Sequence, residues 1–240
     1  MSQADAIPRA AVELISEIVV ANRILFRHNV FDSFGHISVR HDKDPERYLM
    51  SRHLAPGLVT ENDIVTFDLD SNPVVDVGTR YYSERFIHGE IYKARPDVAA
   101  IVHSHAAALI PFGATKTPLR PICHMSAFLG AGVPVFDLRD AAGMTDMMVS
   151  TPELAQGLAG AFADKPMVLI RGAGAAVVGG SVRQVVYRSI YAVHNARLQL
   201  DALRLGEATY LDDEEARLAA EANEGVVDRA WTLWATEVAT

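Results

Sequence analysis

The chain has 240 residues, half of them hydrophobic, which is enough for one large domain with its own core. Its net charge is −8, from 22 Lys and Arg against 30 Asp and Glu, so the composition argues against a general binder of nucleic acids or of anionic membranes. The single cysteine, Cys123, rules out an internal disulfide framework.

The composition of individual segments predicts where the protein is located and how many domains it has. The N-terminal segment does not read as a secretory signal peptide, and no apolar run approaches the ~20 residues that span a bilayer. The chain shows neither a low-complexity linker nor a repeat. We therefore expect a cytoplasmic protein with one domain over residues 1–240, of which 205–240 form a helical extension.

The spacing of apolar residues predicts the secondary structure of the first half. Apolar residues recur at helical spacing over 9–28, and a helix over 83–95 stops before Pro96. Alternating patterns predict a run of antiparallel strands, which is interrupted by a turn at 70–73. The predicted strands cover 34–41, 47–51, 63–70 and, after the second helix, 99–105.

Strands and helices alternate in the second half. Two strands flank a glycine-rich turn within 166–180. In the C-terminal helical stretch, Trp231 and Trp234 either cover the core of the chain or belong to an interface between subunits. The order of elements predicts an α/β or α+β layered domain. The other predicted elements are a helix from about Ala106, a strand over 132–137, and helices over 151–164 with Thr151 as N-cap, 181–203 and 212–236.

Two histidines, His103 and His105, stand one residue apart in an otherwise apolar strand. Residues i and i+2 of a strand share a face, so both imidazoles point to the same side and can bind one divalent metal ion. The alternative is a pair of histidines hydrogen-bonded in a polar cleft. Glu84, at the start of the preceding helix, is a candidate third ligand or general acid/base, or a first-turn carboxylate that complements the helix dipole.

Three stretches resemble the class II aldolase/adducin family: FDSFGHISVRH, SERFIHGEIYKARPDVAAIVHSH and VLIRGAGAAVVGGSV. The resemblance covers about residues 10–205, and Glu84 precedes His103 by the separation that the family keeps. It implies an α/β fold, a class II aldolase-like three-layer α/β/α domain with a central, mostly antiparallel sheet. It also implies a divalent metal ion (Mn2+, Zn2+, Fe2+ or Mg2+) held by three histidines, near a subunit boundary of a homotetramer.

One of the three histidine positions implied by the resemblance carries no ligand. Two of them map to His103 and His105, but Ala173 stands at the third, in the glycine-rich turn, and has no lone pair to give. Three explanations are open. The chain is an engineered His-to-Ala variant, which we favour because the turn is otherwise intact; it is a natural relative with weakened metal affinity; or another residue, such as His124 or His194, takes the position.

The turns that hold a phosphate in family members acting on phosphorylated sugars differ here. His36 replaces an asparagine, Arg52 and His53 replace a small Thr/Ser-Gly pair, and Tyr82 replaces a serine. These residues suit a flatter anionic substrate, since Arg52 can pair with a carboxylate while Tyr82 and Phe34 contact an aromatic ring. Alternatively, Arg52 forms a structural or intersubunit salt bridge and Tyr82 lies in the core.

Two further stretches, SRHLAPGLVTENDIVTFDLD and ERFIHGEIYKARPDV, look most like the branch of the family that decarboxylates dihydroxyphthalates and hydroxylated pyridine-dicarboxylates. The resemblance implies a metal-dependent non-oxidative decarboxylase, a carbon–carbon lyase of aromatic compound catabolism that acts on a small anionic aromatic acid. The catalytic candidates are Glu84 and His124 for proton transfer and Arg171 for a second carboxylate. The substrate-binding candidates are Arg52, His36, Ser83 and Tyr82.

Two other functions are open at this stage. A metal-dependent aldolase or epimerase, acting on a small hydroxylated keto compound or a sugar phosphate, would use the same metal ligands. A non-enzymatic assembly module of the adducin type would need no metal ligands, so the joint presence of Glu84, His103 and His105 argues against it.

Overall fold

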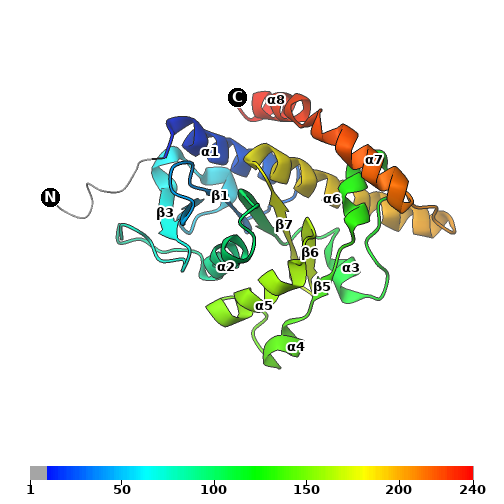
Figure 1. Ribbon diagram of the computed structural model, residues 1–240, viewed down its shortest axis with the longest axis horizontal. Helices are drawn as coiled ribbons and strands as arrows, with labels where there is room; N and C mark the ends of the chain where they lie inside the picture. Colours follow the sequence, from blue (N-terminus) through cyan, green and yellow to red (C-terminus); the bar gives the residue numbers. More distant parts are fainter. Residues whose placement is uncertain (1–9, 240) are drawn as a thin grey trace.

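A seven-stranded sheet forms the centre of the molecule, a computed structural model that describes residues 10–239 (Figure 1). The strand order is β3-β2-β1-β4-β7-β6-β5, and among these strands only β5 and β6 pair in parallel. The predicted α/β class with a mostly antiparallel sheet is therefore confirmed. The strands are β1 His36–Arg40, β2 Arg47–Ser51, β3 Ile64–Asp68, β4 Ala100–Ser104, β5 Val135–Phe136, β6 Met167–Ile170 and β7 Gly174–Gly179.

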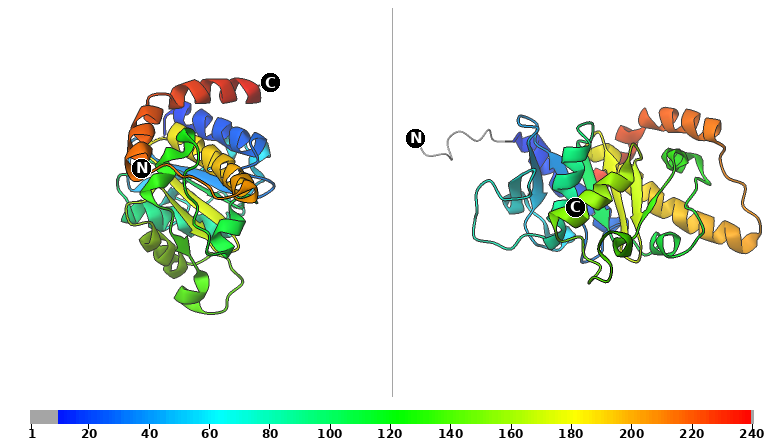
Figure 2. Two further views of the ribbon diagram at one scale, coloured as in Figure 1. Left: turned by 90° about the vertical axis from the view of Figure 1, so that its right-hand side faces the viewer. Right: turned by 60° about the horizontal axis from the view of Figure 1, so that its bottom comes forward.

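Helices cover both faces of the sheet, which gives three layers (Figures 1 and 2). Along β4, Val102 packs into the core that α1 and α6 share with the sheet, whereas its neighbour Ile101 packs into the core shared with α2 and α5. This alternation is the period of two that a strand imposes. On the first face lie α1 Val12–Arg27, α6 Val182–Leu205, α7 Asp213–Glu224 and α8 Val227–Val238; on the second lie α2 Phe86–Ala94, α4 Leu138–Ala142 and α5 Pro152–Phe162.

Several element ends follow local chemistry that the sequence displays. The predicted N-cap Thr151 accepts a hydrogen bond from the Leu154 backbone N–H, which starts α5 one residue later. The helix predicted from about Ala106 begins later, as α3 Ile110–Ala114. Pro111 explains this, because a residue without an N–H suits only the first turn of a helix.

The C-terminal stretch predicted as one helical region is divided at Gly225 into α7 and α8. Trp231 and Trp234 of α8 are buried in the core of their own chain, which favours the first of the two roles considered for them. No helix among residues 10–239 is both long and apolar enough to cross a membrane.

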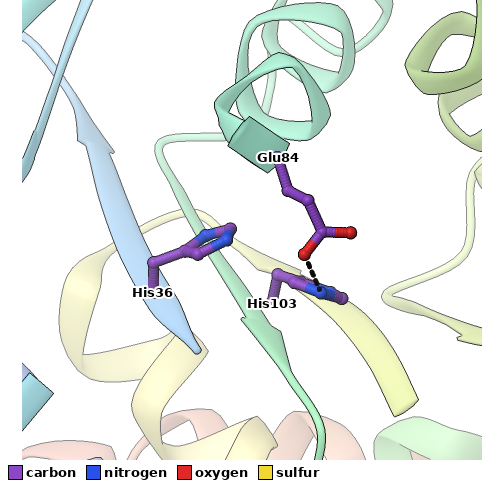
Figure 3. Close-up of side chains that lie close together, drawn as sticks. All are labelled: His36, Glu84 and His103. Carbon is purple, nitrogen blue, oxygen red and sulfur yellow. Dashed lines mark ion pairs between the residues drawn. The ribbon is translucent and has the colours of Figure 1, made fainter. Parts of the chain in front are cut away.

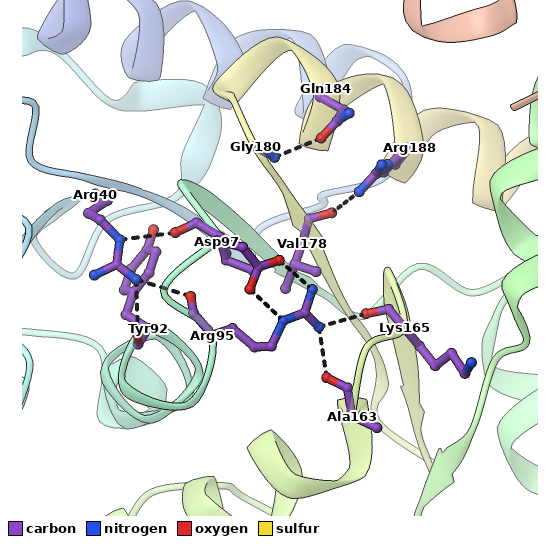
Figure 4. Close-up of polar contacts among 11 residues, drawn as sticks. Arg40, Tyr92, Arg95, Asp97, Ala163, Lys165, Val178, Gly180, Gln184 and Arg188 are labelled. Atoms are coloured by element: carbon purple, nitrogen blue, oxygen red, sulfur yellow. Dashed lines mark hydrogen bonds and ion pairs between the residues drawn. The ribbon is translucent and has the colours of Figure 1, made fainter. Parts of the chain in front are cut away.

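Arg95, at the end of α2, joins this helix to the loop between α5 and β6 (Figure 4). Its Nη1 donates to the carbonyl oxygens of Ala163 and Lys165, and its Nε donates to Asp97 at 2.8 Å. These bonds connect the C-terminal end of α2 to the α5–β6 loop, on the face of the sheet that α2 and α5 cover.

Candidate functional site

Two histidines face each other across β1 and β4. His36 and His103 are register partners in this antiparallel pair, and their ring centroids lie 5.2 Å apart. Both side chains point to the α2 side of the sheet, because Ile37 and Val102 next to them pack on the opposite side. Both residues are buried, and His103 is fully inaccessible.

One nitrogen of His103 is left to face the site. Its Nδ1–H donates to the Ala175 carbonyl oxygen at 3.1 Å, since a carbonyl can only accept, so Nδ1 already has a partner and Nε2 is the nitrogen on the side of Glu84. This Nε2 is buried, has no hydrogen-bond partner within residues 10–239, and lies 3.5 Å from Glu84 Oε2 (Figure 3). A buried ring nitrogen that faces a carboxylate oxygen at this distance needs a proton or a cation between the two atoms.

Glu84 lies at a kink in the 3-10 turn Ser83–Arg85 that precedes α2, and its carboxylate is oriented by two kinds of contact. Oε1 accepts from the Val149 backbone N–H at 3.1 Å, while Oε2 lies 3.5 Å from His103 Nε2 and 4.0 Å from His105 Nε2. Burial opposes ionisation, but the imidazoles and the Val149 N–H outweigh it and lower the pKa of Glu84 far below its ordinary value of 4.5. His103 and His105 therefore both face the carboxylate of Glu84.

These side chains fit a divalent metal ion. One donor atom from each of His36, Glu84 and His103 lies within 4.8 Å of the other two. Ligands bonded to a tetrahedral ion at ~2.1 Å are about 3.4 Å apart, so small side-chain movements bring the three atoms around one ion. Imidazoles combined with a carboxylate suit Zn2+, Fe2+ or Mn2+ better than Mg2+.

A buried hydrogen-bonded chain lies behind His36. Its Nδ1 is 2.6 Å from His88 Nε2, His88 Nδ1 is 2.6 Å from Ser38 Oγ, and Ser38 Oγ is 2.8 Å from the Tyr92 hydroxyl. Ser38 follows His36 by two residues on β1, and Tyr92 follows His88 by one turn on α2, so each pair shares a face. Burial, with the neighbouring imidazoles, lowers the pKa of His36 and brings that of His88 to about 3, which leaves both neutral at pH 7.

Sequence reasoning did not single out His88 or Tyr92. The available signal was weak: two polar aromatic residues one turn apart on a helix whose other residues are largely apolar. Such a pattern gains meaning only when the partner strand is known, because the hydrogen bonds run to β1 and not along α2.

A cavity of about 600 Å3, here called the site cavity, opens beside these ligands. Among residues 10–239, no Lys or Arg lines it. Its apolar wall consists of Phe34, Leu54, Ala55, Leu58, Met147 and Met148. The other lining residues are Ser33, Gly35, His36, His53, Tyr82, Ser83, Glu84, His105 and Ala173.

Tyr82 belongs to both the core and the site cavity. Its ring lies 4.8 Å from that of His36 and 5.5 Å from that of His53, and its hydroxyl donates to the Leu54 carbonyl oxygen. Burial raises the pKa of this hydroxyl, so it stays protonated. Tyr82 thus lines the site cavity, while its hydroxyl is already hydrogen-bonded to the Leu54 carbonyl oxygen.

Ala173 lines the site cavity in the turn between β6 and β7. The turn is pressed against the end of β4: a Cβ added to Gly174 would lie 2.0 Å from the Ser104 carbonyl oxygen, and Gly174 has φ = +126°. Only glycine fits there. The turn lies beside the His103–His105 segment, but position 173 contributes no donor side chain.

Both arginines proposed for substrate binding are held by carboxylates outside the site cavity. Arg52 Nε donates to Asp63 Oδ1 at 2.7 Å, and Arg171 Nε lies 2.7 Å from Asp137 Oδ2. Neither lines the site cavity. Their roles in substrate binding stay predictions, and in this chain each guanidinium already has an oppositely charged partner close in space.

The two histidines considered for the third ligand position also lie elsewhere. His124 lines a separate cavity with Tyr187 and Trp234, and His194 is exposed on α6 beside Tyr191. His194 is part of α6, and His124 packs beside α7, where Asn223 Nδ2 donates to its carbonyl oxygen, so both lie on the opposite face of the sheet from His103. The role of His124 in proton transfer stays a prediction that its position in the single chain does not support.

Known proteins resemble this chain in sequence and in fold. The model of the class II aldolase and adducin N-terminal domain family matches residues 16–200. The chain is 39% identical over 241 aligned residues to decarboxylase tropJ of Talaromyces stipitatus, covering 90% of this chain and 91% of the relative. It is 32% identical over 206 residues to a 3,4-dihydroxyphthalate decarboxylase of Arthrobacter keyseri, covering 80% of this chain and 79% of the relative.

Solved structures share the fold. An aldolase II superfamily protein from Pseudomonas syringae superposes with a TM-score of 0.79 at 22% identity, covering 98% of this chain and 95% of the other. L-fuculose 1-phosphate aldolase from Glaciozyma antarctica gives a TM-score of 0.79 at 21% identity, covering 98% and 94%. The decarboxylase and aldolase relatives support a lyase activity. By its sequence and its sheet, the chain belongs to the class II aldolase and adducin N-terminal domain family.

Proposed function

We propose that this chain is a divalent-metal-dependent, non-oxidative decarboxylase of a hydroxylated aromatic acid of the phthalate or pyridine-dicarboxylate type. One observation carries the proposal: a cluster of metal-ligating side chains borders a cavity whose remaining wall is apolar. The apolar wall suits a flat aromatic ring, and an ion held by the cluster suits an oxygen substituent of that ring. The similarity to decarboxylase tropJ and to a 3,4-dihydroxyphthalate decarboxylase supports the same class of reaction.

His103, His105 and Glu84 are the residues that we assign to the metal. His103 offers Nε2, since its Nδ1 is used by the Ala175 carbonyl oxygen, and Glu84 offers Oε2, since its Oε1 accepts from Val149. The bound ion supplies Lewis-acid chemistry, the withdrawal of electrons from an oxygen substituent of the ring. Because no Lys or Arg among residues 10–239 lines the site cavity, we expect substrate affinity to depend on the metal charge.

The side chains of the site cavity have distinct roles in this proposal. Phe34 and Met147 hold the aromatic ring, Tyr82 limits its position next to His36, and Ser83 offers a hydroxyl to a polar substituent. Apolar surroundings disfavour a carboxylate relative to neutral CO2, which favours cleavage. The ring carbon that bears the carboxylate first takes a proton from water, which leaves hydroxide. The bond from this carbon to the carboxylate then breaks, CO2 leaves, and the electron pair of that bond restores the aromatic ring.

The homotetramer implied by the family resemblance is also part of the proposal. Leu58, at the rim of the site cavity, is 66% exposed in the single chain, and such apolar surface is typical of a contact region. Light scattering should give four times the mass of one chain.

A second candidate is a metal-dependent aldolase or epimerase, acting on a small hydroxylated keto compound or a sugar phosphate. The shared fold with L-fuculose 1-phosphate aldolase favours it. Against it, binding of a phosphate needs small hydrogen-bond donors or a free cationic side chain. Arg52 is held by Asp63, and Tyr82, which lines the site cavity, stands where the sugar-phosphate enzymes have a serine.

The proposal is tested by substrate turnover. Protein loaded separately with Zn2+, Fe2+, Mn2+ or Mg2+ is incubated with a dihydroxyphthalate, a hydroxypyridine-dicarboxylate or a ketose phosphate, beside EDTA-treated protein. CO2 release that depends on the metal supports the decarboxylase. Cleavage of the ketose phosphate without CO2 release would establish the second candidate instead.

A further inference from the structure

His36 has the geometry of a metal ligand, although its sequence context suggested contact with substrate. It lies opposite His103 in the β1–β4 register, is buried, and lines the site cavity with Glu84 and His105. It is also one of the three residues whose donor atoms lie within 4.8 Å of one another. Figure 3 shows its ring beside the Glu84 carboxylate.

The two nitrogens of His36 have different surroundings. Nδ1 lies 2.6 Å from His88 Nε2, so it is occupied by a hydrogen bond within the protein. Nε2 is then the nitrogen left for the site. This is the arrangement of metal-bound histidines in general, in which one nitrogen binds the ion and the other bonds to a second residue that fixes the ring.

The chain of hydrogen bonds behind His36 can run in two directions. In one direction the Tyr92 hydroxyl donates to Ser38, Ser38 to His88, and His88 to His36, which leaves a proton on His36 Nε2. In the opposite direction His36 Nδ1–H donates to His88, and Nε2 carries a lone pair. A cation at the site favours the second direction.

We propose that His36 Nε2 supplies the third imidazole of the metal centre, beside His103 and His105. This inference rests on the metal dependence proposed above, and it assigns to β1 a ligand that position 173, occupied by alanine, does not provide. His88 is a positioning residue in this arrangement: it acts only through His36, by accepting from Nδ1 and holding the ring toward Glu84.

Metal affinity separates a ligand from a substrate contact. Isothermal titration of EDTA-treated protein with Zn2+ is compared between the wild type, His36→Asn and His53→Asn. Asn at position 36 keeps a polar group near the place of Nδ1 and removes Nε2. His53 is the matched control, because it lines the same cavity, is exposed, and lies outside the ligand cluster.

We expect His36→Asn to weaken Zn2+ binding by more than about 100-fold, since loss of an outer partner alone costs about 10–100-fold. His53→Asn should bind as the wild type does. His88→Gln should weaken binding by about 10–100-fold, and His88→Asn, whose shorter side chain leaves His36 Nδ1 without a partner, by at least as much. Equal affinity of His36→Asn and wild type would overturn the inference while leaving metal dependence intact; a wild type that binds no Zn2+ would overturn the proposed function itself.

A second measurement needs no substitution and stays decisive where His36→Asn does not fold. The 15N chemical shifts of the wild-type imidazoles are recorded with and without Zn2+. The inference requires that Zn2+ shifts His36 Nε2 and leaves Nδ1 protonated. Zn2+-induced shifts confined to His103 and His105 would contradict it.

Discussion

His36 and His103 are register partners on adjacent antiparallel strands, with their ring centroids 5.2 Å apart. The proposed metal centre is therefore built on the rigid middle of the sheet. Glu84 and His105 are added from the segments that follow the strands or precede α2. This arrangement allows the contributions of ligands, cavity wall and fold to be tested separately.

The carboxylate of Glu84 should determine how much a metal stabilises the fold. An ion at 100 times its dissociation constant stabilises a folded protein by about 2.7 kcal/mol. Glu84→Gln keeps the side-chain size but removes the anionic oxygen facing His103 and His105, so most of this gain should disappear at the same ion concentration. Thermal unfolding with Zn2+ and with EDTA measures it. Glu61→Gln, an exposed substitution outside the site cavity, serves as control; an equal gain in both variants would exclude Glu84 as a ligand.

Ala173→His should raise metal affinity. Position 173 lines the site cavity together with His105 and Glu84, and a histidine there adds an imidazole to the ligand set. We expect at least a tenfold gain in affinity, about 1.4 kcal/mol, by titration calorimetry. Ala173→Leu adds comparable bulk without a lone pair and should bring no gain. If the histidine variant binds no more metal than the chain with Ala173, the β6–β7 turn does not belong to the metal site.

Phe34→Ala should weaken binding of an aromatic substrate without affecting folding. Phe34 lines the site cavity and is mostly exposed, so its ring contributes little to the core. Loss of one aromatic contact, about 0.5–1.5 kcal/mol, should raise KM by up to about tenfold. Phe26→Ala, an exposed aromatic residue at another cavity, is the matched control. An unchanged KM for Phe34→Ala would argue against a ring seated on this wall.

Asp63 should make stability dependent on pH in the acid range. Burial opposes its ionisation, but bonds from the Thr60 hydroxyl and backbone N–H and from Arg52 outweigh it and lower its pKa below the ordinary 3.8. A lowered pKa in the folded state stabilises the fold above pH 3.8, and this contribution is lost as pH falls through the folded-state value.

Asp63→Asn removes the charge that these bonds stabilise. We expect a loss of about 1–3 kcal/mol at pH 7 and a smaller further loss between pH 4 and 2 than in the wild type, measured by urea unfolding. Asp70→Asn, whose side chain is 74% exposed, should change neither quantity much. Parallel pH profiles for the wild type and Asp63→Asn would show that Asp63 does not carry this dependence.

Gly174→Ala should disrupt the site through the backbone. A Cβ at Gly174 would lie 2.0 Å from the Ser104 carbonyl oxygen, and the residue has a positive φ. We expect a loss of about 2–4 kcal/mol in the free energy of unfolding, together with weaker metal binding, because Ser104 lies between His103 and His105. Gly160→Ala, inside α5 with open space around its Cβ, should instead gain about 0.5–1 kcal/mol. Similar stabilities of the two variants would contradict the strain at the turn.

Local patterns predicted the parts of the fold that depend on local geometry. The apolar spacing and the N-cap Thr151 predicted the position of α5. The period of two along a strand predicted that His103 and His105 share a face, and both lie within 4.0 Å of the Glu84 carboxylate. The three-layer arrangement of one sheet between two layers of helices followed from the family resemblance, whose motifs lie on β1, β4 and the β6–β7 turn.

What the sequence missed depends on register between distant segments. The position of His36 opposite His103 follows from the pairing of β1 with β4, which no apolar period encodes. Arg52 meets Asp63 because Ser51 and Ile64 are paired at the adjoining ends of β2 and β3. Arg52 therefore forms the salt bridge that was the alternative to substrate binding, and the donor atoms of His36, assigned to substrate, lie within 4.8 Å of those of Glu84 and His103.

Anomalous diffraction from crystals grown with Zn2+ tests the metal centre most directly. We predict one strong peak on the α2 side of β1 and β4, about 2.1 Å from His103 Nε2 and His36 Nε2, with Glu84 Oε2 and His105 Nε2 completing the ligand set. Zn2+ bound only elsewhere on the chain, with the His103 Nε2 position free of metal, would contradict it.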